Sequence, residues 1–306
     1  MLISIVTPSY RRPDFLADTV ESVIHQKGGF ELEYIIQDGG GCDRTKKLLE
    51  KLQLESRLTP NAARRRMTVY SEPDDGMYAA INRGFSRASG DILAWLNSDD
   101  MYHPFALDTV CRIFSQHPSV MWITGIPNSY NQEGARTGFD AFPNAYSRPF
   151  VEAGYYDVKF LQYGFNWIQQ ESTFWRRELW EQAGPLNESL RYAADFFLWR
   201  SFAKYTDLVK VYSFLGGFRV HGNQFTADAS RYRTELPQVE PPAGLRDFVK
   251  LVKSDPSAKA RYLGVDEESQ QRLQQRFGLR RPQLCGRTIR WRHHENSWRL
   301  QWELIV

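Results

Sequence analysis

Residues 1–125 alternate short apolar runs with amphipathic stretches, and this alternation constrains the fold more than any other feature of the sequence. The apolar runs have the length of buried strands, and the amphipathic stretches repeat their apolar residues with the period of a helix. Strands without a polar face are typical of parallel sheets that helices cover on both sides. We therefore predict an α/β fold with a Rossmann-like, mixed but mostly parallel sheet. The expected elements are strands 2–6, 34–37, 67–70, 92–96 and 119–124, and helices 14–26, 48–52, 76–88 and 103–116.

The pattern after residue 125 is less regular. Residues 126–165 are rich in Gly, Pro, Asn and aromatic side chains, and we expect a loop-rich excursion there. The last residues alternate apolar and polar side chains, which predicts a half-buried strand over 298–304, paired as a hairpin with 288–292. A proline-rich linker over 237–244 precedes this part. The expected helices are 172–181, 194–204, 245–253 and 267–277, and the expected division is a domain over 1–230 and a basic C-terminal extension over 231–306.

Composition excludes several classes of protein. The chain has 42% hydrophobic and 25% charged residues, which is ordinary for a globular fold. A net charge of +3 is too small to indicate a polyanionic partner, so we expect no nucleic acid. The three cysteines (Cys42, Cys111 and Cys285) lie too far apart for a zinc site and indicate reduced thiols. The first residues do not resemble a signal peptide, and no apolar run is long enough to span a membrane, so we expect a cytoplasmic protein.

Aromatic residues make up 14% of the chain. Rings at this density indicate either a thick core or surfaces on which flat ligands such as bases and sugars stack.

Two adjacent carboxylates directly follow the strand expected over 92–96, in the run Asn97-Ser98-Asp99-Asp100. In parallel sheets ligands bind beyond the carboxyl ends of the strands. Carboxylate oxygens there suit Mg²⁺ or Mn²⁺, which also hold substrate phosphates. On these residues alone, capping of the next helix is an equally good explanation.

A second acidic cluster spans residues 71–76, just before another expected helix. Asn82 and Arg83 fall within the first two turns of that helix, where they would face a diphosphate or a base, and the forked donors of arginine suit phosphate. Helix capping again explains the acids without a ligand. The glycines at 39–41 do not form a dinucleotide fingerprint, because Arg44 stands where the third glycine would fall.

Several motifs in fixed order resemble glycosyltransferase family 2. The resemblance covers roughly residues 1–226, and the linked motifs are more specific together than any one of them. The matching segments are Leu2–Arg12 (LISIVTPSYRR), Tyr34–Thr45 (YIIQDGGGCDRT), Ser71–Gly84 (SEPDDGMYAAINRG), Ser89–Asp100 (SGDILAWLNSDD), Gln170–Leu179 (QESTFWRREL), Ala183–Leu186 (AGPL), Tyr192–Arg200 (YAADFFLWR) and Phe218–Thr226 (FRVHGNQFT).

This resemblance implies a GT-A fold, a nucleotide-sugar donor (a UDP-sugar first), a divalent metal (Mn²⁺ or Mg²⁺) and inverting transfer to a carbohydrate or lipid-linked acceptor. Asp99 would be the metal ligand of the D-x-D motif, with Asp100 as a possible helper, although Asn97 replaces the first aspartate of that motif. The nucleotide-binding residues that it implies, together with Arg83, are Thr7, Pro8, Tyr10, Asp38, Asp74 and Asn82.

The chemistry explains why further groups are needed. A bound cation stabilises the charge that develops on the leaving diphosphate, and a general base takes the proton of the acceptor hydroxyl. Asp195 matches the catalytic aspartate of the family, although Ala194 stands where the family often has glutamate. Glu171, next to Gln170, is the rival base.

His221 matches a family position near the diphosphate or the metal, and Arg219 lies two residues before it. Simpler explanations remain open, because a single histidine is often structural. Asp195 can likewise be explained as the N-cap of a helix.

The basic tail carries arginines and two tryptophans that suit a phospholipid or a polyprenyl-phosphate acceptor, so contact with the inner face of a membrane is one expectation and a solvated hairpin is the other. Two other functions remain as alternatives. A sugar-nucleotide pyrophosphorylase would carry a glycine-rich, lysine-containing segment after the first strand, which TPSYRRPD is not. A non-catalytic nucleotide-sugar-binding protein would not need both Asp99 and Asp195.

Overall fold

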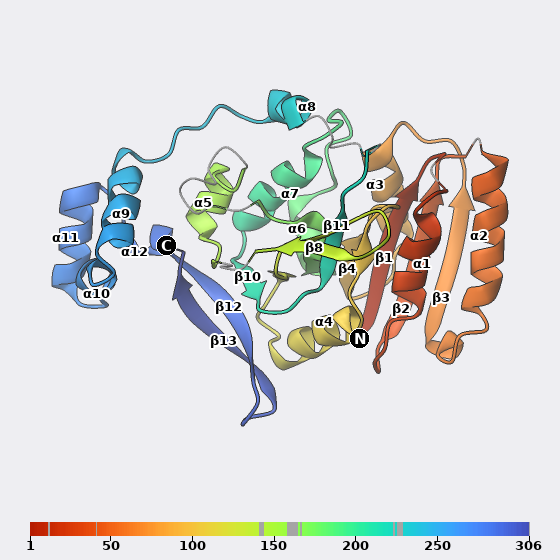
Figure 1. The fold of residues 1–306 in the computed structure, drawn as a ribbon, viewed down its shortest axis with the longest axis horizontal. Helices are drawn as coiled ribbons and strands as arrows, with labels where there is room; N and C mark the ends of the chain where they lie inside the picture. Colours follow the sequence, from red (N-terminus) through yellow and green to blue (C-terminus); the bar gives the residue numbers. More distant parts are fainter. Residues whose placement is uncertain are drawn as a thin grey trace.

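The computed structural model describes residues 1–11, 13–40, 42–140, 144–157, 165, 167–222, 224 and 229–305. Five residues of the motifs quoted above lie outside the described residues: Arg12, Gly41, Asn223, Phe225 and Thr226. Within these ranges the chain folds around a nine-stranded sheet and a four-stranded sheet (Figure 1).

The N-terminal half of the large sheet is parallel, as the alternating sequence pattern predicts. Strand β1 pairs with β2 on one side and β4 on the other, and β3 pairs with β2. The strands are β1 (Leu2–Ser9), β2 (Glu31–Asp38), β3 (Arg65–Ser71) and β4 (Ile92–Trp95), and the helices between and after them are α1 (Leu16–Ile24), α2 (Asp43–Ser56), α3 (Met77–Arg87) and α4 (Ala106–Gln116). A short 3₁₀ turn, Ala62–Arg64, precedes β3.

The other half of the sheet contains a strand that was expected as a helix. β9 (Thr173–Arg176) lies antiparallel between β4 and β6 (Trp122–Thr124), and only α6 (Arg177–Ala183) is helical in that stretch. The prediction of a helix over 172–181 is therefore wrong in its first half. The β-branched and aromatic residues of β9 are buried between two apolar strands, and this packing overrides helical spacing.

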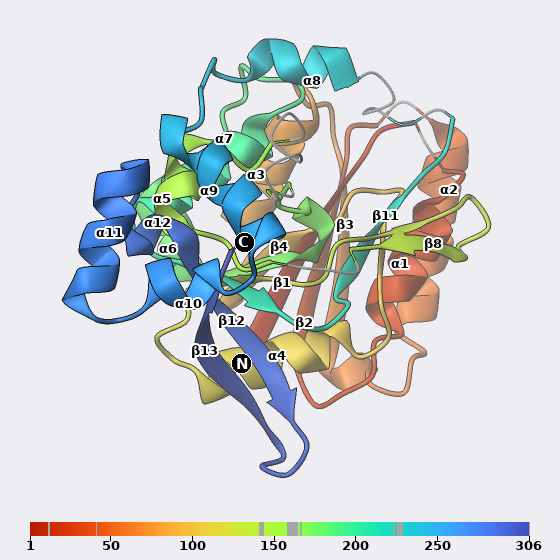
Figure 2. The same ribbon diagram turned by 60° about the vertical axis from the view of Figure 1, so that its left-hand side comes forward.

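Beyond β6, the sheet continues with residues from the C-terminal extension. β10 (Leu208–Val211) is parallel to β6, β12 (Cys285–Arg292) is parallel to β10, and β13 (Ser297–Leu304) closes the edge as an antiparallel hairpin with β12. The terminal hairpin is therefore confirmed, and it projects below the sheet in Figure 2. The division of the chain at residue 230 stays a prediction, although this hairpin completes the sheet of the first part.

The region expected to be loop-rich holds regular elements. β7 (Asn128–Tyr130) and β8 (Arg136–Phe139) belong to the small sheet, and α5 (Arg148–Ala153) follows them. The small sheet has the order β5-β11-β7-β8, where β5 is Met101–Tyr102 and β11 is Gly216–Arg219. These strands are too short for an alternating pattern to reveal them.

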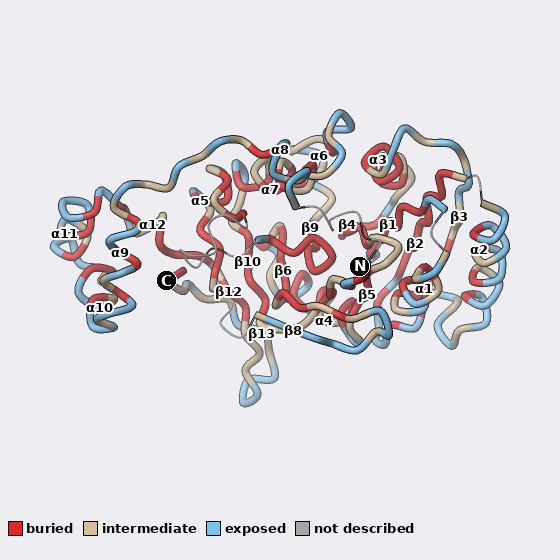
Figure 3. The backbone as a smooth tube through the Cα atoms, turned by 45° about the horizontal axis from the view of Figure 1, so that its top comes forward, coloured by how far each residue is buried: buried red, intermediate tan, exposed pale blue. Residues whose placement is uncertain are grey.

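Helices cover both faces of the large sheet. Figure 3 shows α3, α6 and α7 (Ala194–Ala203) along one face and α1 and α4 along the other, with the buried strands between them. Aromatic rings fill the first interface: Trp95 of β4 stacks on Trp199 of α7 at 5.8 Å, and Trp175 of β9 contacts both. Much of the aromatic excess is therefore core.

The remaining helices are short and peripheral. They are α8 (Ala229–Glu235), α9 (Ala243–Ser254), α10 (Ala258–Leu263), α11 (Glu267–Phe277) and α12 (Arg281–Leu284). The expected helices over 245–253 and 267–277 are thus confirmed within one or two residues. No helix in the described ranges combines the length and the apolar character that a membrane span requires.

Candidate functional site

The carboxyl ends of the first three strands meet in register at one edge of the sheet. Ser9, Asp38 and Ser71 stand side by side as the last residues of β1, β2 and β3. The Asp38 carboxylate is buried, and its Oδ2 accepts a hydrogen bond from the Ser71 hydroxyl at 2.7 Å. Its Oδ1 and the Ser9 hydroxyl are buried without a hydrogen-bond partner among the described residues. A buried acceptor without a donor costs free energy and is expected to meet a ligand.

Gly39 allows two other predicted residues to approach Asp38. A Cβ atom at Gly39 would lie 2.7 Å from Asp74 Oδ2 and 2.9 Å from the Tyr10 ring, so a larger residue there would displace these two side chains. The Tyr10 side chain is 55% exposed, which leaves ring surface available to a flat ligand. Burial raises the pKa of Asp74, whose Oδ1 accepts a hydrogen bond from the Gly76 backbone at 3.0 Å. The structure thus brings Tyr10, Asp38 and Asp74 together.

Thr7 and Pro8 lie in the interior of the sheet rather than at its edge. Thr7 is fully buried, and its hydroxyl forms a 3.0 Å hydrogen bond with the Tyr34 hydroxyl. Pro8 is buried opposite Gln37 of β2. Their contribution to a nucleoside pocket stays a prediction.

Asn82 and Arg83 make contacts within the protein. The Asn82 amide donates to the backbone oxygen of Leu186 at 2.9 Å and accepts from its backbone N–H at 3.0 Å. It also donates to Glu188 at 2.7 Å. Arg83 donates to the Pro73 backbone oxygen at 2.9 Å, which holds the acidic turn in place. Nucleotide contacts by these two residues stay predictions, and the structure shows what they do in the fold.

Asp99 and His221 meet at the end of β4. His221 Nε2 lies 3.0 Å from Asp99 Oδ2, and the imidazole packs on the Phe15 ring with 4.7 Å between ring centroids. His221 is buried, whereas the Asp99 side chain is 22% exposed. The pair therefore joins a carboxylate and an imidazole that are 122 residues apart in the chain.

Arg219 fixes this pair in place. Its guanidinium is buried, donates to the Asp99 backbone oxygen at 2.8 Å and to the Gln132 backbone oxygen at 2.7 Å, and forms a 3.0 Å ion pair with Asp18. Its backbone N–H donates to Asp100 Oδ1 at 2.8 Å. Asp100 is buried, and desolvation raises its pKa well above the usual value. Arg219 and Asp100 are thus structural neighbours of the Asp99–His221 pair, and Asp100 has little access to a ligand.

Gln170 and Glu171 lie in the 3₁₀ turn Gln170–Ser172, directly before β9. The Gln170 amide donates to the Trp95 backbone oxygen at 2.6 Å, which ties this turn to the end of β4. Glu171 is buried and accepts a hydrogen bond from Gln169. Burial raises the pKa of Glu171 to about 8, so at neutral pH it holds its proton. This disfavours Glu171 as a base that takes a proton from a substrate.

Asp195 lies in the first turn of α7 and is half-buried. Its Oδ1 is buried without a hydrogen-bond partner in the described ranges. Burial raises the pKa of Asp195 to about 6, while backbone N–H groups of the first helical turn oppose the shift. The carboxylate is therefore ionised at neutral pH but basic enough to accept a proton near that pH, as a general base requires.

The donor set suits a divalent cation only if substrate oxygens complete it. The described residues contain no group of three His, Cys, Asp or Glu side chains arranged to hold a metal. Asp99 and His221 supply one carboxylate and one imidazole. Such a pair fits a cation that keeps most of its coordination sites for phosphate and water, and the imidazole favours Mn²⁺ over Mg²⁺.

Residues that sequence reasoning left without a role complete the site. Ser9 and Ser71 flank Asp38, and only the strand register reveals them. Glu235 from α8 accepts hydrogen bonds from three backbone N–H groups that precede Asp195. No local pattern in the sequence could have indicated that contact.

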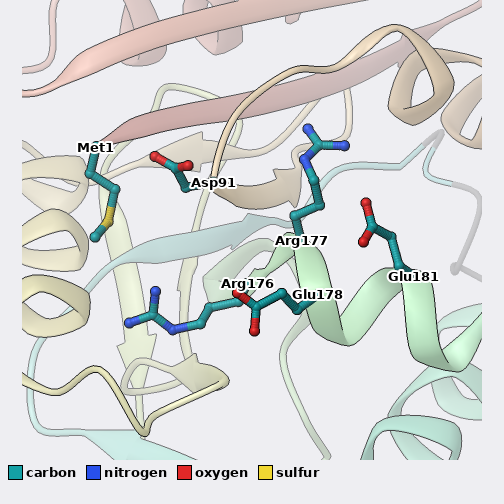
Figure 4. Close-up of a pocket in the computed structure, with 6 residues that line it drawn as sticks. All are labelled: Met1, Asp91, Arg176, Arg177, Glu178 and Glu181. Carbon is teal, nitrogen blue, oxygen red and sulfur yellow. The ribbon is translucent and has the colours of Figure 1, made fainter.

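A pocket of about 510 Å³ lies elsewhere, at the opposite edge of the large sheet. Figure 4 shows Met1 and Asp91, which precede β1 and β4, facing Arg176, Arg177 and the start of α6. This edge carries the amino ends of the parallel strands, where substrates of such sheets do not bind. We therefore expect the functional site at the other edge.

Comparisons with known proteins identify the family of this chain. The sequence matches the model of the family described as "Glycosyl transferase family 2" over residues 4–176. This span contains the whole parallel half of the large sheet together with Asp38, Asp74, Asp99 and Glu171. Asp195, Arg219, His221 and Glu235 lie beyond it.

Curated relatives are glycosyltransferases by name. The chain is 31% identical over 125 residues to a putative teichuronic acid biosynthesis glycosyltransferase, TuaG, of Bacillus subtilis, a match of 40% of this chain and 46% of the relative. It is 27% identical over 198 residues to a PGL/p-HBAD biosynthesis glycosyltransferase of Mycobacterium bovis, a match of 64% of this chain and 67% of the relative. The chain thus spans less than half of the Bacillus protein.

Solved structures share the fold at low identity. The S. aureus TarS fragment 1–349 in complex with UDP-GlcNAc aligns with a TM-score of 0.57 and 15% identity, over 88% of this chain and 78% of that one. The mannosyltransferase PcManGT from Pyrobaculum calidifontis, in complex with GDP-Man and Mn²⁺, aligns with a TM-score of 0.53 and 13% identity, over 89% and 78%. The predicted GT-A fold is confirmed.

Proposed function

The chain belongs to glycosyl transferase family 2, and from this we propose that it transfers a sugar from a nucleoside-diphosphate donor to an acceptor hydroxyl with inversion of the anomeric carbon. The observations that carry the proposal are two buried carboxylate oxygens that have no hydrogen-bond partner among the described residues, Asp38 Oδ1 and Asp195 Oδ1, together with the Asp99–His221 pair at the end of β4. The Asp38 oxygen can accept a hydrogen bond from a nucleoside, and the Asp195 oxygen can accept the proton of an acceptor hydroxyl.

The Asp38 carboxylate favours a uracil base. Its Oδ2 already accepts from Ser71, which leaves Oδ1 for one donor. Uracil offers a single ring N–H, whereas guanine presents two neighbouring donors and would need both oxygens. The exposed Tyr10 ring offers a stacking surface beside it. A UDP-sugar, as in the TarS complex, is the donor we propose.

Asp99 and His221 would hold a divalent cation, Mn²⁺ first, together with the diphosphate. When bound, the cation supplies charge stabilisation to the leaving diphosphate. Arg219 keeps Asp99 at the end of β4 through its 2.8 Å bond to the backbone, so the carboxylate is preorganised. Asp18 balances the buried guanidinium.

Asp195 is the general base of this proposal. Attack on the anomeric carbon from the face opposite the diphosphate inverts it, and the hydroxyl proton must pass to a base on the acceptor side. The free Oδ1 of Asp195 can accept that proton, whereas Glu171 is protonated at neutral pH and engaged with Gln169.

The acceptor in this proposal is a carbohydrate or lipid-linked hydroxyl. The relatives named above are glycosyltransferases of teichuronic acid and of PGL/p-HBAD biosynthesis. Peripheral contact of the basic hairpin with an anionic membrane is part of the same proposal. The hairpin carries an exposed Trp302 (61% exposed) and arginines near it.

The direct test is thermal unfolding of the protein with each nucleoside diphosphate and Mn²⁺. A ligand that binds the folded state raises Tm, and at equal concentration a tighter ligand raises it more. We expect UDP with Mn²⁺ to raise Tm and GDP to raise it less. Hydrolysis of UDP-sugars in the presence of Mn²⁺ then identifies the sugar. If no nucleotide raises Tm and no donor is cleaved, the proposal is wrong.

A further inference from the structure

Glu235, the last residue of α8, makes contacts with the segment that leads into α7. Its carboxylate accepts hydrogen bonds from the backbone N–H groups of Arg191 at 2.8 Å, Tyr192 at 2.9 Å and Ala193 at 2.9 Å. These three residues directly precede Ala194, the first residue of α7, so their N–H groups lie outside the hydrogen bonds of that helix. A carboxylate from another helix accepts all three.

An apolar contact accompanies this polar one. Ala193, Phe196 and Leu236 form a buried cluster separate from the main core, and Phe197 and Tyr232 pack against it. The cluster joins the beginning of α7 to the end of α8, and Figure 2 shows α8 lying over α7 at one end of the molecule. α8 is thus seated on α7 by both charge-assisted hydrogen bonds and hydrophobic burial.

Asp195 follows this clamped segment after one residue. The direction of its carboxylate depends on the path of residues 191–193, because one misplaced turn at the start of α7 would move the side chain away from the acceptor. We propose that Glu235 is a positioning residue for the base Asp195, so that the C-terminal extension completes the sugar-transfer site. This inference rests on the proposed function, and it assigns to α8 a role outside the family match over residues 4–176.

The charge of Glu235 also acts on Asp195. After burial, which is the larger cause, the negative charge of Glu235 raises the pKa of Asp195. The other titratable groups that interact with Asp195 are Tyr78 of α3, Tyr232 of α8 and Glu171 of the 3₁₀ turn, and Tyr232 interacts in turn with Asp157. Both tyrosines are neutral at neutral pH because burial raises their pKa.

Removal of this charge has a defined sign. Without the charge of Glu235, the pKa of Asp195 falls, and the acidic limb of the kcat–pH profile moves to lower pH. A residue that only stabilised the fold would not move that limb. A second discriminating readout is which kinetic constant changes. We expect kcat to fall and the donor KM to stay the same, because the donor site at Asp38 lies in another part of the sheet edge.

The experiment compares Glu235→Gln, Glu235→Ala and a matched control, Asp266→Ala. Asp266 also accepts a backbone N–H at a helix start, from Ser269 at 2.8 Å, but it caps α11 in the peripheral part of the extension. We expect Glu235→Ala to lower kcat about tenfold or more with the donor KM within twofold of wild type, since small misplacements of a catalytic group are that costly. Glu235→Gln keeps the side-chain shape, and its acidic limb should move to lower pH. Asp266→Ala should change neither parameter.

The outcomes separate this inference from the proposed function. An unchanged kcat and an unchanged acidic limb in both Glu235 variants would overturn the inference, as would an equal loss in Asp266→Ala. If the wild type transfers no sugar, the proposed function fails, yet ¹³C carboxyl titration of Asp195 (assigned with Asp195→Asn) still decides the coupling. In that case, the inference would be overturned if the Asp195 titration and the amide exchange at residues 191–193 were the same in Glu235→Gln as in the wild type. A shift of the Asp195 pKa to a lower value, together with faster exchange, would support it.

Discussion

The proposed catalytic edge has a nucleotide half, at Asp38 and the Asp99–His221 pair, and an acceptor half, at Asp195, and these halves are built in different ways. In the nucleotide half, Ser9, Asp38 and Ser71 end three consecutive parallel strands and are aligned by strand register alone. In the acceptor half, Asp195 depends on contacts between α7 and α8 that no sheet register provides. The register of a parallel sheet thus positions the residues of the nucleotide half. The acceptor half depends instead on contacts between segments that are distant in the sequence.

The two halves also differ in electrostatics. Asp38 is buried but accepts a hydrogen bond from Ser71, and Asp99 lies beside His221. In the acceptor half, burial raises the pKa of Asp195 to about 6 and that of Glu171 to about 8. In the acceptor half, burial disfavours the charged form of these carboxyl groups, which lowers the stability of the folded protein at neutral pH. The same burial gives Asp195 the pKa of a base that can accept a proton near neutral pH.

Asp195→Asn should break the acceptor half and leave the nucleotide half intact. The amide has nearly the same shape but cannot take a proton, so we expect transfer to fall about 10³-fold, within the usual range for a general base. The Kd for UDP with Mn²⁺, measured by calorimetry, should not change. Asp247→Asn on the exposed surface of α9 is the matched control and should keep wild-type turnover. Turnover of Asp195→Asn close to that of the control would contradict the assignment.

Asp99→Ala and His221→Ala test the proposed cation site of the nucleotide half. Each removes one of the two donors in the 3.0 Å pair, so we expect about a 10²-fold loss of Mn²⁺-dependent donor cleavage, consistent with several kcal/mol of charge stabilisation. Titration with Mn²⁺ should show weaker metal dependence in both variants. Equal Mn²⁺ dependence in wild type and Asp99→Ala would show that the cation site lies elsewhere.

Asp195→Asn should also stabilise the protein at neutral pH. The folded state raises the pKa of Asp195 from its usual 3.8 to about 6, so the native protein binds this proton more tightly than the unfolded chain. Its contribution to stability falls as pH rises from about 4 to 6 and stays lower above that window. We expect the variant to gain about 3 kcal/mol at pH 7.5, as a shift of that size implies, and to gain nothing near pH 3.5. Urea unfolding at the two pH values measures this, and an equal effect at both would exclude the pKa as its cause.

The same division into local and long-range contacts separates what the sequence could predict from what it could not. The parallel strands, the turn after Asp38 and the acids after β4 come from local patterns, and the structure confirms those elements. β9 was expected as a helix because its four residues become a strand only between β4 and β6. β10 and β11 are four residues each, too short for a period to stand out.

The long-range contacts of Asp195 and His221 could not be predicted from local patterns, for a physical reason. The bond from Glu235 to Ala193 joins residues 42 positions apart, and the Asp99–His221 pair joins residues 122 apart. Such contacts depend on packing rather than on local propensity. Only the resemblance to known sequences placed Asp195 and His221 near the site, and it offered no reason to consider α8.

The smallest expected effects concern base recognition in the nucleotide half. Asp38→Asn replaces the charged acceptor at Oδ1 by a neutral group, and we expect UDP to bind about tenfold more weakly, as for the loss of one charge-assisted hydrogen bond. Ser71→Ala is the finer test, because it frees Oδ2 of Asp38 from its 2.7 Å hydrogen bond. Guanine could then pair with both oxygens, so the preference for UDP over GDP should narrow by about fivefold, the worth of one hydrogen bond. Ser56→Ala, at a buried hydroxyl in the last residue of α2, is the control and should leave the preference unchanged. A preference that stays the same in Ser71→Ala would mean that Asp38 does not read the base.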